Sequence, residues 1–293
     1  MVKKNLRLIV RKMISAGENE TINNAINRKK IKFKKKIFKK AITLDELQLT
    51  LLNLGINKGD NIMVHASWRE FFNYQGKPED VINTLKDLIG EDGTLLMPSY
   101  GNDRTFFDVN NTTSNAGVLS ELFRLQMNTI RSACTHFSIS ASGKNAFDLT
   151  KNHFKSEYGF DNNSPYYLFT KLPNSKVLFL GLGQEPTQIS LFHCAGYILK
   201  DKIPIYSKLL SYRYNSILVK DGVKFEKDMV IRQPGHKNNN QMFKRIFRSV
   251  NNKKQVKISN LDIVIMDAKE GLDKAIEFGK KGKYCYINME KLK

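Results

Sequence analysis

Short apolar runs alternate with amphipathic stretches along most of the chain. Buried strands are predicted where apolar runs are short and end at a turn residue or proline, over residues 62–65, 94–98 and 176–181. Helices are predicted where apolar residues recur with helical spacing, over residues 79–89 and 118–127. Thr43 with Glu46 forms a capping box that opens an earlier helix, and Gly55 closes it. This succession of strand, helix and strand predicts an α/β core.

The pattern changes beyond residue 203. The turn residues Asp221 and Gly222 separate two stretches, 212–219 and 223–231, and predict an antiparallel hairpin. A polar loop, a strand and a helix are then predicted over residues 237–241, 256–266 and 269–278. The predicted fold class is α/β, with a central mixed sheet flanked by helices and an added antiparallel β layer in the C-terminal part. We expect residues 42–293 to form this single domain.

Residues 1–41 differ from the rest and are predicted to form a basic, helical N-terminal leader. Residues 1–40 contain fourteen Lys and Arg against two Glu, mixed with apolar residues at partly helical spacing. A peripheral membrane contact or a nucleic-acid contact is one interpretation. A solvated helix packed on the domain by its apolar stripe is the favoured one.

The net charge of +20 indicates attraction to polyanions such as phosphorylated cofactors, nucleic acid or acidic lipid. The leader holds most of this excess, so the remainder of the chain is only moderately basic and no nucleic-acid partner is expected. No stretch of about 18 uninterrupted apolar residues exists, and a cytoplasmic location is expected. The three cysteines, Cys134, Cys194 and Cys285, lack metal-ligand spacing and cannot all pair with one another, so we expect reduced thiols and no bound metal.

Several catalytic and nucleotide-binding motifs are absent. Gly181 and Gly183 are followed by Pro186 where a dinucleotide-binding loop needs its third small residue. The phosphate-binding loop, the nucleophile elbow, H-E-x-x-H and C-x-x-C are also missing. The sequence therefore lacks the motifs that usually indicate dinucleotide binding, phosphoryl transfer, triad hydrolysis or zinc chemistry.

Among the five histidines, His193 has the most suggestive position. It follows a predicted strand and turn and lies in an apolar run that reads as the start of a buried helix. An imidazole held at such a junction is oriented and partly desolvated, which suits a general base. A satisfied core histidine is an equally good interpretation of this pattern alone.

A series of short blocks resembles the aminoglycoside 3-N-acetyltransferase family. The first block, with Gly59-Asp60 followed by Val64-His65-Ala66-Ser67, is similar to the family's G-D-x-x-x-V-H-S-S opening. Later blocks follow in the family's order, over residues 93–99, 117–124, 131–132, 138–146, 163–166, 177–181 and 190–193. Together they span roughly residues 43 to 200.

The resemblance implies acyl transfer from acyl-CoA to the amine of an aminated sugar, in a ternary complex without a covalent enzyme intermediate. His193 stands at the family's catalytic histidine, which would take a proton from the attacking amine. The cofactor-side blocks of the family match His65, Ala66, Ser67, Arg131, Ser132, Ser138 and Ser164. We assign the acceptor side to Trp68, Glu121, Asp161 and Ser190. For any one of the serines, ordinary turn or cap chemistry is an equally good interpretation.

The sequence also departs from the family pattern. Where the family writes R-S-x-H-P, Cys134 and Thr135 replace histidine and proline, and His136 could compensate. In the block T-x-L-H-x-A-E, Ser190 replaces threonine and Gly196 replaces glutamate. Another group must therefore orient His193, and the candidates are Asp161, Glu185 and Glu121.

Charge separates the possible acceptors. An aminoglycoside carries several positive charges and would be repelled by a protein at +20, whereas the diphosphate of a nucleotide-linked sugar would be attracted. The first hypothesis is therefore transfer of an acetyl or short acyl group, such as hydroxybutyryl, to a dTDP- or UDP-linked amino sugar for surface-polysaccharide synthesis. The alternatives are an aminoglycoside 3-N-acetyltransferase that confers antibiotic resistance and a non-catalytic basic binding protein on the same scaffold. Membrane contact through the leader and a homo-oligomer are left open.

Overall fold

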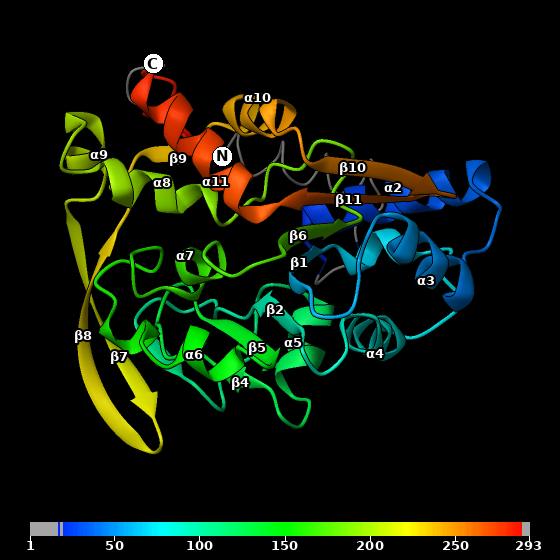
Figure 1. Ribbon diagram of the computed structural model, residues 1–293, viewed down its shortest axis with the longest axis horizontal. Coiled ribbons are helices and arrows are strands. Elements are labelled where there is room, and N and C mark those ends of the chain that lie inside the picture. Colours follow the sequence, from blue (N-terminus) through cyan, green and yellow to red (C-terminus); the bar gives the residue numbers. More distant parts are fainter. Residues whose placement is uncertain (1–16, 18–19, 289–293) are drawn as a thin grey trace.

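The structure is a computed structural model that describes residue 17 and residues 20–288. A seven-stranded sheet forms its centre, in the order β10-β11-β6-β1-β2-β5-β4 (Figure 1). These strands are β1 Asn61–Ala66, β2 Thr94–Pro98, β4 Ile130–Arg131, β5 Ile139–Gly143, β6 Ser175–Leu180, β10 Lys253–Ile258 and β11 Leu261–Asp267. Strand β1 pairs in parallel with β2 and β6, and the other pairings are antiparallel. The predicted mixed sheet is confirmed.

Helices cover both faces of this sheet. They are α3 Leu44–Asn53, α4 Pro78–Ile89, α5 Val118–Arg124, α6 Ala146–Thr150, α7 Pro165–Phe169, α8 Phe192–Leu199, α9 Pro204–Leu209, α10 Asn240–Ser249 and α11 Ala268–Lys280. On β6, Leu178 and Leu180 pack with α3, α4 and α5, whereas Val177 and Phe179 face the cluster of α6, α7, α8, α10 and α11. Both faces of β6 are therefore buried, which explains its continuous apolar run.

Two small sheets extend the core. Strands β7 Tyr212–Lys220 and β8 Val223–Ile231 form the predicted hairpin, and β3 Phe106–Asp108 joins β7 in parallel. Asp221 and Gly222 both have positive φ, as the tight turn requires. The hairpin lies at the end of the molecule opposite α3 and α4 (Figure 1). This confirms the added antiparallel layer.

The structure corrects two predicted elements. The predicted strand over 256–266 is a hairpin, because the chain turns at Ser259, which has a φ of 50°, and β10 pairs back on β11. The predicted loop over 237–241 contains β9 His236–Asn238 and the start of α10. Strand β9 pairs with β12 Tyr286–Asn288, a partner nearly fifty residues away that a local pattern does not reveal.

The described part of the leader contains the helix α2 Ile22–Ile37. Lys34 on this helix pairs with Glu70 of the domain at 2.7 Å, and Ala25 is fully buried. The first sixteen residues, which supplied much of the predicted amphipathic pattern, lie outside the described residues. The division into a leader and a domain, and any function of the leader, stay predictions.

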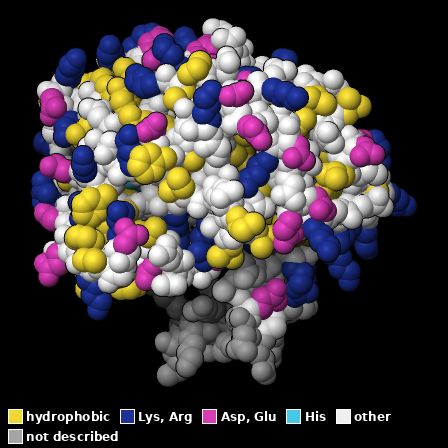
Figure 2. Space-filling view, turned by 60° about the horizontal axis from the view of Figure 1, so that its bottom comes forward, with side chains coloured by type: hydrophobic (Ala, Val, Ile, Leu, Met, Phe, Trp, Pro, Cys, Tyr) yellow, Lys and Arg dark blue, Asp and Glu magenta, His cyan; other side chains and the backbone are white. Residues whose placement is uncertain are grey.

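Charge is spread over the molecule. Figure 2 shows Lys and Arg side chains distributed over one face with Asp and Glu side chains among them. Within the described residues, no helix is long and apolar enough to cross a bilayer. The net charge thus attracts anions in general, and recognition of a particular anion requires a local site.

Candidate active site

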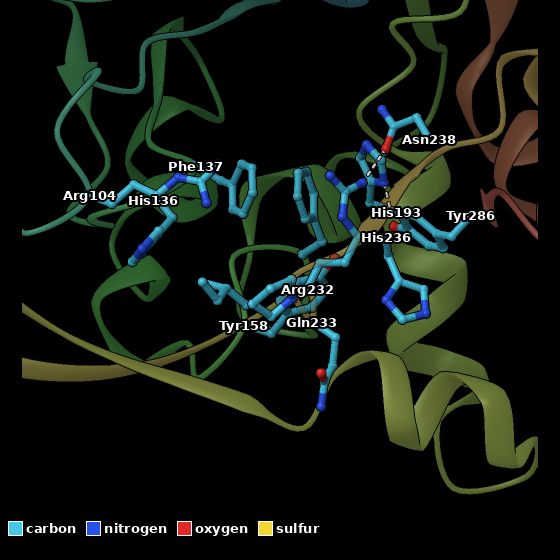
Figure 3. A pocket seen from close by; sticks show the side chains of 13 residues that line it. Arg104, His136, Phe137, Tyr158, His193, Arg232, Gln233, His236, Asn238 and Tyr286 are labelled. Atoms are coloured by element: carbon cyan, nitrogen blue, oxygen red, sulfur yellow. Dashed lines mark hydrogen bonds between the residues drawn. The ribbon is translucent and has the colours of Figure 1, made fainter. Parts of the chain in front are cut away.

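His193 lies in the first turn of α8, after the loop that follows β6. Aromatic rings surround it, with ring centroids at 4.9 Å for Phe160, 5.6 Å for Phe243 and 5.6 Å for Tyr286. Its Nδ1 atom is 2.5 Å from the Tyr286 hydroxyl oxygen (Figure 3). The imidazole is therefore packed on several sides and fixed in orientation, as the sequence pattern predicted for this junction.

Two cavities meet at His193, which lines both. Cavity 1 has a volume of about 290 Å³, and its polar lining comprises Arg104, His136, Arg232, Gln233, His236 and Asn238. Cavity 2 has a volume of about 240 Å³, and its polar lining includes His65, Tyr100, Ser120, Gln188 and Ser190. No Asp or Glu among the described residues lines either cavity. His193 can thus reach two ligands, one on each side.

The contact with Tyr286 bears on which nitrogen of His193 is free. The Tyr286 hydroxyl lies 2.5 Å from Nδ1 and can accept a hydrogen bond from Nδ1–H. In this tautomer the lone pair lies on Nε2, which is then the site that can take a proton.

Burial keeps the His193 ring neutral. Desolvation is the main cause that lowers the pKa of His193 to about 3, and the positive charge of Arg232 and the ring of His65 lower it further. A ring with a lowered pKa is unprotonated across neutral pH. The ring therefore has no proton to lose first, but a pKa this low also makes it a weaker base than the near-neutral pKa that suits a general base.

The group that orients His193 is not one of the three predicted carboxylates. Asp161 accepts from Ser156 and nearby backbone N–H groups, Glu121 pairs with Arg124, and Glu185 pairs with Arg248. Each is held by other partners, so these three candidates are wrong. Tyr286 takes the role instead. It lies 93 residues further along the chain, and no sequence motif pointed to it.

The absence of a side chain at Gly196 leaves room for the ring of Tyr286 beside His193. A Cβ atom at residue 196 would lie 3.3 Å from the ring of Tyr206 and 3.8 Å from that of Tyr286. The space that a glutamate side chain would enter is therefore filled by two aromatic rings. The absence of the expected glutamate and the presence of Tyr286 belong to one local arrangement.

The predicted cofactor-side residues fall into two groups. His65 and Ala66 line cavity 2 with His193, whereas Ser67, the residue after β1, is not among the described residues that line either cavity. The other four have structural partners and line neither cavity. The Arg131 guanidinium donates to backbone carbonyls, Ser132 bonds His153, Ser138 bonds the Ser132 carbonyl, and Ser164 caps α7. The structure does not bring these four to the cavities, and their role in cofactor binding stays a prediction.

The predicted acceptor-side residues are also divided. Ser190 lines cavity 2 beside His193. Trp68 stacks on Phe71 and packs against the core cluster on the other face of the sheet, while Glu121 and Asp161 have the partners given above. These three do not line the cavities, and their role in acceptor binding stays a prediction.

Three further histidines present unpartnered nitrogens. Nε2 of His136 and Nδ1 of His236 in cavity 1, and Nε2 of His65 in cavity 2, are buried without a hydrogen-bond partner in the described structure. Burial lowers the pKa of His65 and that of His136 to about 4. His136 is thus placed beside the site, as its position after the altered family block suggested.

The comparisons with known proteins agree on one family. A family model described as aminoglycoside 3-N-acetyltransferase matches residues 63–279. Aminoglycoside N(3)-acetyltransferase IV of Salmonella is 38% identical over 143 residues, which cover 48% of this chain and 54% of the relative. The aminoglycoside N(3')-acetyltransferase-like protein YokD of Bacillus subtilis is 29% identical over 198 residues, covering 59% of this chain and 68% of the relative.

Solved structures share the fold. The aminoglycoside acetyltransferase AAC(3)-Xa has a TM-score of 0.72 at 18% identity and covers 88% of this chain and 99% of its own. AAC-IIIb, solved with CoASH, has a TM-score of 0.69 at 21% identity, and the match covers 83% of this chain and 98% of AAC-IIIb. The match to the Salmonella relative spans about half of that protein's length. Because the family model covers most of the residues from β1 to α11, this chain belongs to the aminoglycoside 3-N-acetyltransferase family.

Proposed function

We propose that this chain is an acyl-CoA-dependent N-acyltransferase that transfers an acetyl or short acyl group to the amine of an aminated sugar. The observation that carries the proposal is the position of His193 between two cavities, with Nδ1 held by Tyr286 and Nε2 free. The family membership supports the same chemistry.

In the proposed reaction the thioester end of acyl-CoA lies in cavity 2 and the acceptor amine in cavity 1. Among the residues that the structure describes, none that lines cavity 2 is a Lys, Arg, Asp or Glu, which suits the uncharged pantetheine arm. The amine nitrogen attacks the thioester carbonyl while His193 Nε2 removes a proton from that nitrogen. When the tetrahedral intermediate collapses, the C–S bond breaks and the CoA sulfur takes the proton that His193 Nε2 had removed, so that the amide and the CoA thiol form and the neutral ring is restored.

The names of the relatives favour an aminoglycoside acceptor, the alternative in our sequence interpretation, over a nucleotide-linked sugar. Four curated relatives are named aminoglycoside N(3)-acetyltransferases. One observation favours the second candidate, a dTDP- or UDP-linked amino sugar for surface-polysaccharide synthesis. Cavity 1 contains two arginines and no carboxylate, which is an unfavourable environment for a polycationic drug.

The proposed function is tested by release of free CoA thiol from acetyl-CoA in the presence of a panel of amines. We expect turnover with at least one class, kanamycin-like aminoglycosides or dTDP- and UDP-linked amino sugars, and the mass of the product identifies the acylated acceptor. Thiol release that no acceptor accelerates, from protein shown to bind CoA, would contradict the proposal.

Replacing Tyr286 with phenylalanine is expected to lower kcat about tenfold and to leave the KM for acyl-CoA unchanged. The substitution removes the acceptor for Nδ1–H and keeps the ring that packs on His193, and a single hydrogen bond contributes on this scale. The measurement is steady-state kinetics with the best acceptor from the panel.

Tyr284→Phe is the matched control, because Tyr284 contacts Tyr206 instead of His193. We expect kinetics like those of the unaltered protein. An equal loss of kcat in both variants, or an unchanged kcat for Tyr286→Phe, would show that Tyr286 does not position His193.

A further inference from the structure

Cavity 1 contains two arginines that lack a carboxylate partner. Arg104 forms no ion pair with the described residues, and Arg232 donates only to the neutral amide oxygen of Asn238. Among the other arginines in the described part of the chain, Arg28, Arg124, Arg213 and Arg248 have an acidic partner. Two guanidinium groups without a counter-charge in one cavity are therefore available to an anionic ligand.

His136 adds a buried ring nitrogen to the same cavity lining. The side chain is only 7% exposed, and its Nε2 atom has no partner in the described structure. Nδ1 of His136 lies 2.8 Å from the Thr135 hydroxyl, whose other contact is the Ser216 hydroxyl. In the tautomer in which Nδ1 accepts from Thr135, Nε2 carries the proton and can donate to an anion.

The three side chains surround one space. Arg104 and His136 lie across cavity 1 from His193 and Tyr286 in Figure 3. Arg232 directly follows β8, and its guanidinium lies over the Tyr286 ring at 5.4 Å. The amide side chains of Gln233 and Asn238 supply further polar contacts in the lining. This set resembles the environment that multivalent oxygen anions require, because both charge and N–H donors converge.

We propose that Arg104, Arg232 and His136 form a phosphate subsite next to His193, which binds the diphosphate of a nucleotide-linked amino-sugar acceptor. The inference rests on the proposed N-acyltransferase function, because His193 must act on the amine of the bound ligand. The subsite would hold the anionic part of the acceptor and leave the sugar amine toward Nε2.

CoA is a second possible source of phosphate, so the test must separate the two. Cavity 2, which we assign to the acyl arm, contains no arginine or lysine. If the arginines bound the phosphates of CoA, a nucleoside diphosphate would compete with CoA. If they bind the acceptor, both ligands are held at once.

The experiment is calorimetric titration of the protein with UDP and with dTDP, in the absence and in the presence of saturating CoA. We expect binding in both conditions, weaker at higher salt. Arg232→Gln and Arg104→Gln should each raise the dissociation constant for the nucleoside diphosphate about 10- to 100-fold, which is the range for a lost charge-assisted contact. The dissociation constant for CoA should stay unchanged in both variants. Arg213→Gln, an exposed residue that pairs with Asp228, is the matched control and should change neither constant.

The outcomes distinguish the subsite from the catalytic proposal. Nucleoside diphosphate that binds only without CoA, together with weaker CoA binding in the arginine variants, would assign the arginines to the cofactor and overturn the subsite. Binding that is absent, or equal in all variants, would also overturn it. Because this titration needs no turnover, a protein that binds UDP as expected but acylates no amine would contradict the proposed function alone.

Discussion

Replacing His193 with alanine is expected to lower kcat by about 10² to 10⁴, the usual contribution of a general base. The variant lacks the Nε2 lone pair that accepts the amine proton, whereas the lining of cavity 2 is otherwise complete. We therefore expect acyl-CoA binding to stay close to that of the unaltered protein. The measurement is single-turnover and steady-state kinetics alongside CoA titration.

His193→Asn separates the catalytic role from a structural one. The asparagine amide can reproduce the bond from Nδ1–H to Tyr286 but has no equivalent of Nε2. We expect folding stability near that of the unaltered protein and a kcat as low as that of the alanine variant. Recovery of kcat in His193→Asn would show that the histidine acts only by packing.

The pH profile gives a further readout of the same histidine. Its folded pKa is lowered to about 3, below the ordinary value of 6.5, so the neutral base is present above this range and is lost only as pH falls through the folded pKa. A profile of kcat/KM should therefore show no loss from His193 protonation between pH 8 and pH 6. An acidic limb near pH 6.5 that His193→Asn abolishes would contradict this assignment.

Replacing Phe179 with alanine is expected to reduce the free energy of unfolding by about 3–5 kcal/mol, because it opens a cavity in the centre of the core. Phe179 is fully buried on β6, the strand between β1 and β11, and its ring stacks on that of His65 with the ring centroids 5.6 Å apart. The loss should be accompanied by weaker acyl-CoA binding, since His65 lines cavity 2. Denaturant unfolding and CoA titration measure the two effects.

Leu178→Ala is the matched control on the opposite face of β6. Leu178 is also fully buried, and its substitution should cost about 2–5 kcal/mol without an effect on the site. If both variants weakened CoA binding equally, the effect would be one of general stability. A stability loss below 1 kcal/mol for Phe179→Ala would show that the core repacks around it.

Local patterns predicted the main elements well. The apolar runs that became β1, β2 and β6 are nearly continuous because each strand lies in a sheet that is buried on both faces. The cap at Thr43 was predicted from its spacing to Glu46, and its hydroxyl accepts from the Glu46 N–H at 3.2 Å. The hairpin of β10 and β11 was missed, because its turn has only the two residues Ser259 and Asn260 as a signal and contains no Gly or Pro.

The candidate site was predicted only in part. The position of His193 could be inferred because a strand, a turn and the start of a helix are neighbours in sequence. The partner of its Nδ1 atom could not, since Tyr286 approaches through the pairing of β12 with β9. The three carboxylates that the sequence offered are all engaged elsewhere.

The sequence by itself determined strands β1, β2, β6, β7 and β8, several helices and the place of His193 at the start of α8, because each depends on residues close together in the chain. Tertiary structure alone decided the surroundings of that histidine. Cavity 1 combines the loop before β3, the end of β8, strand β9 and Tyr286 of β12. These segments are brought together by strand pairing and by core packing, and long-range contacts of this kind leave no periodic signal in the sequence.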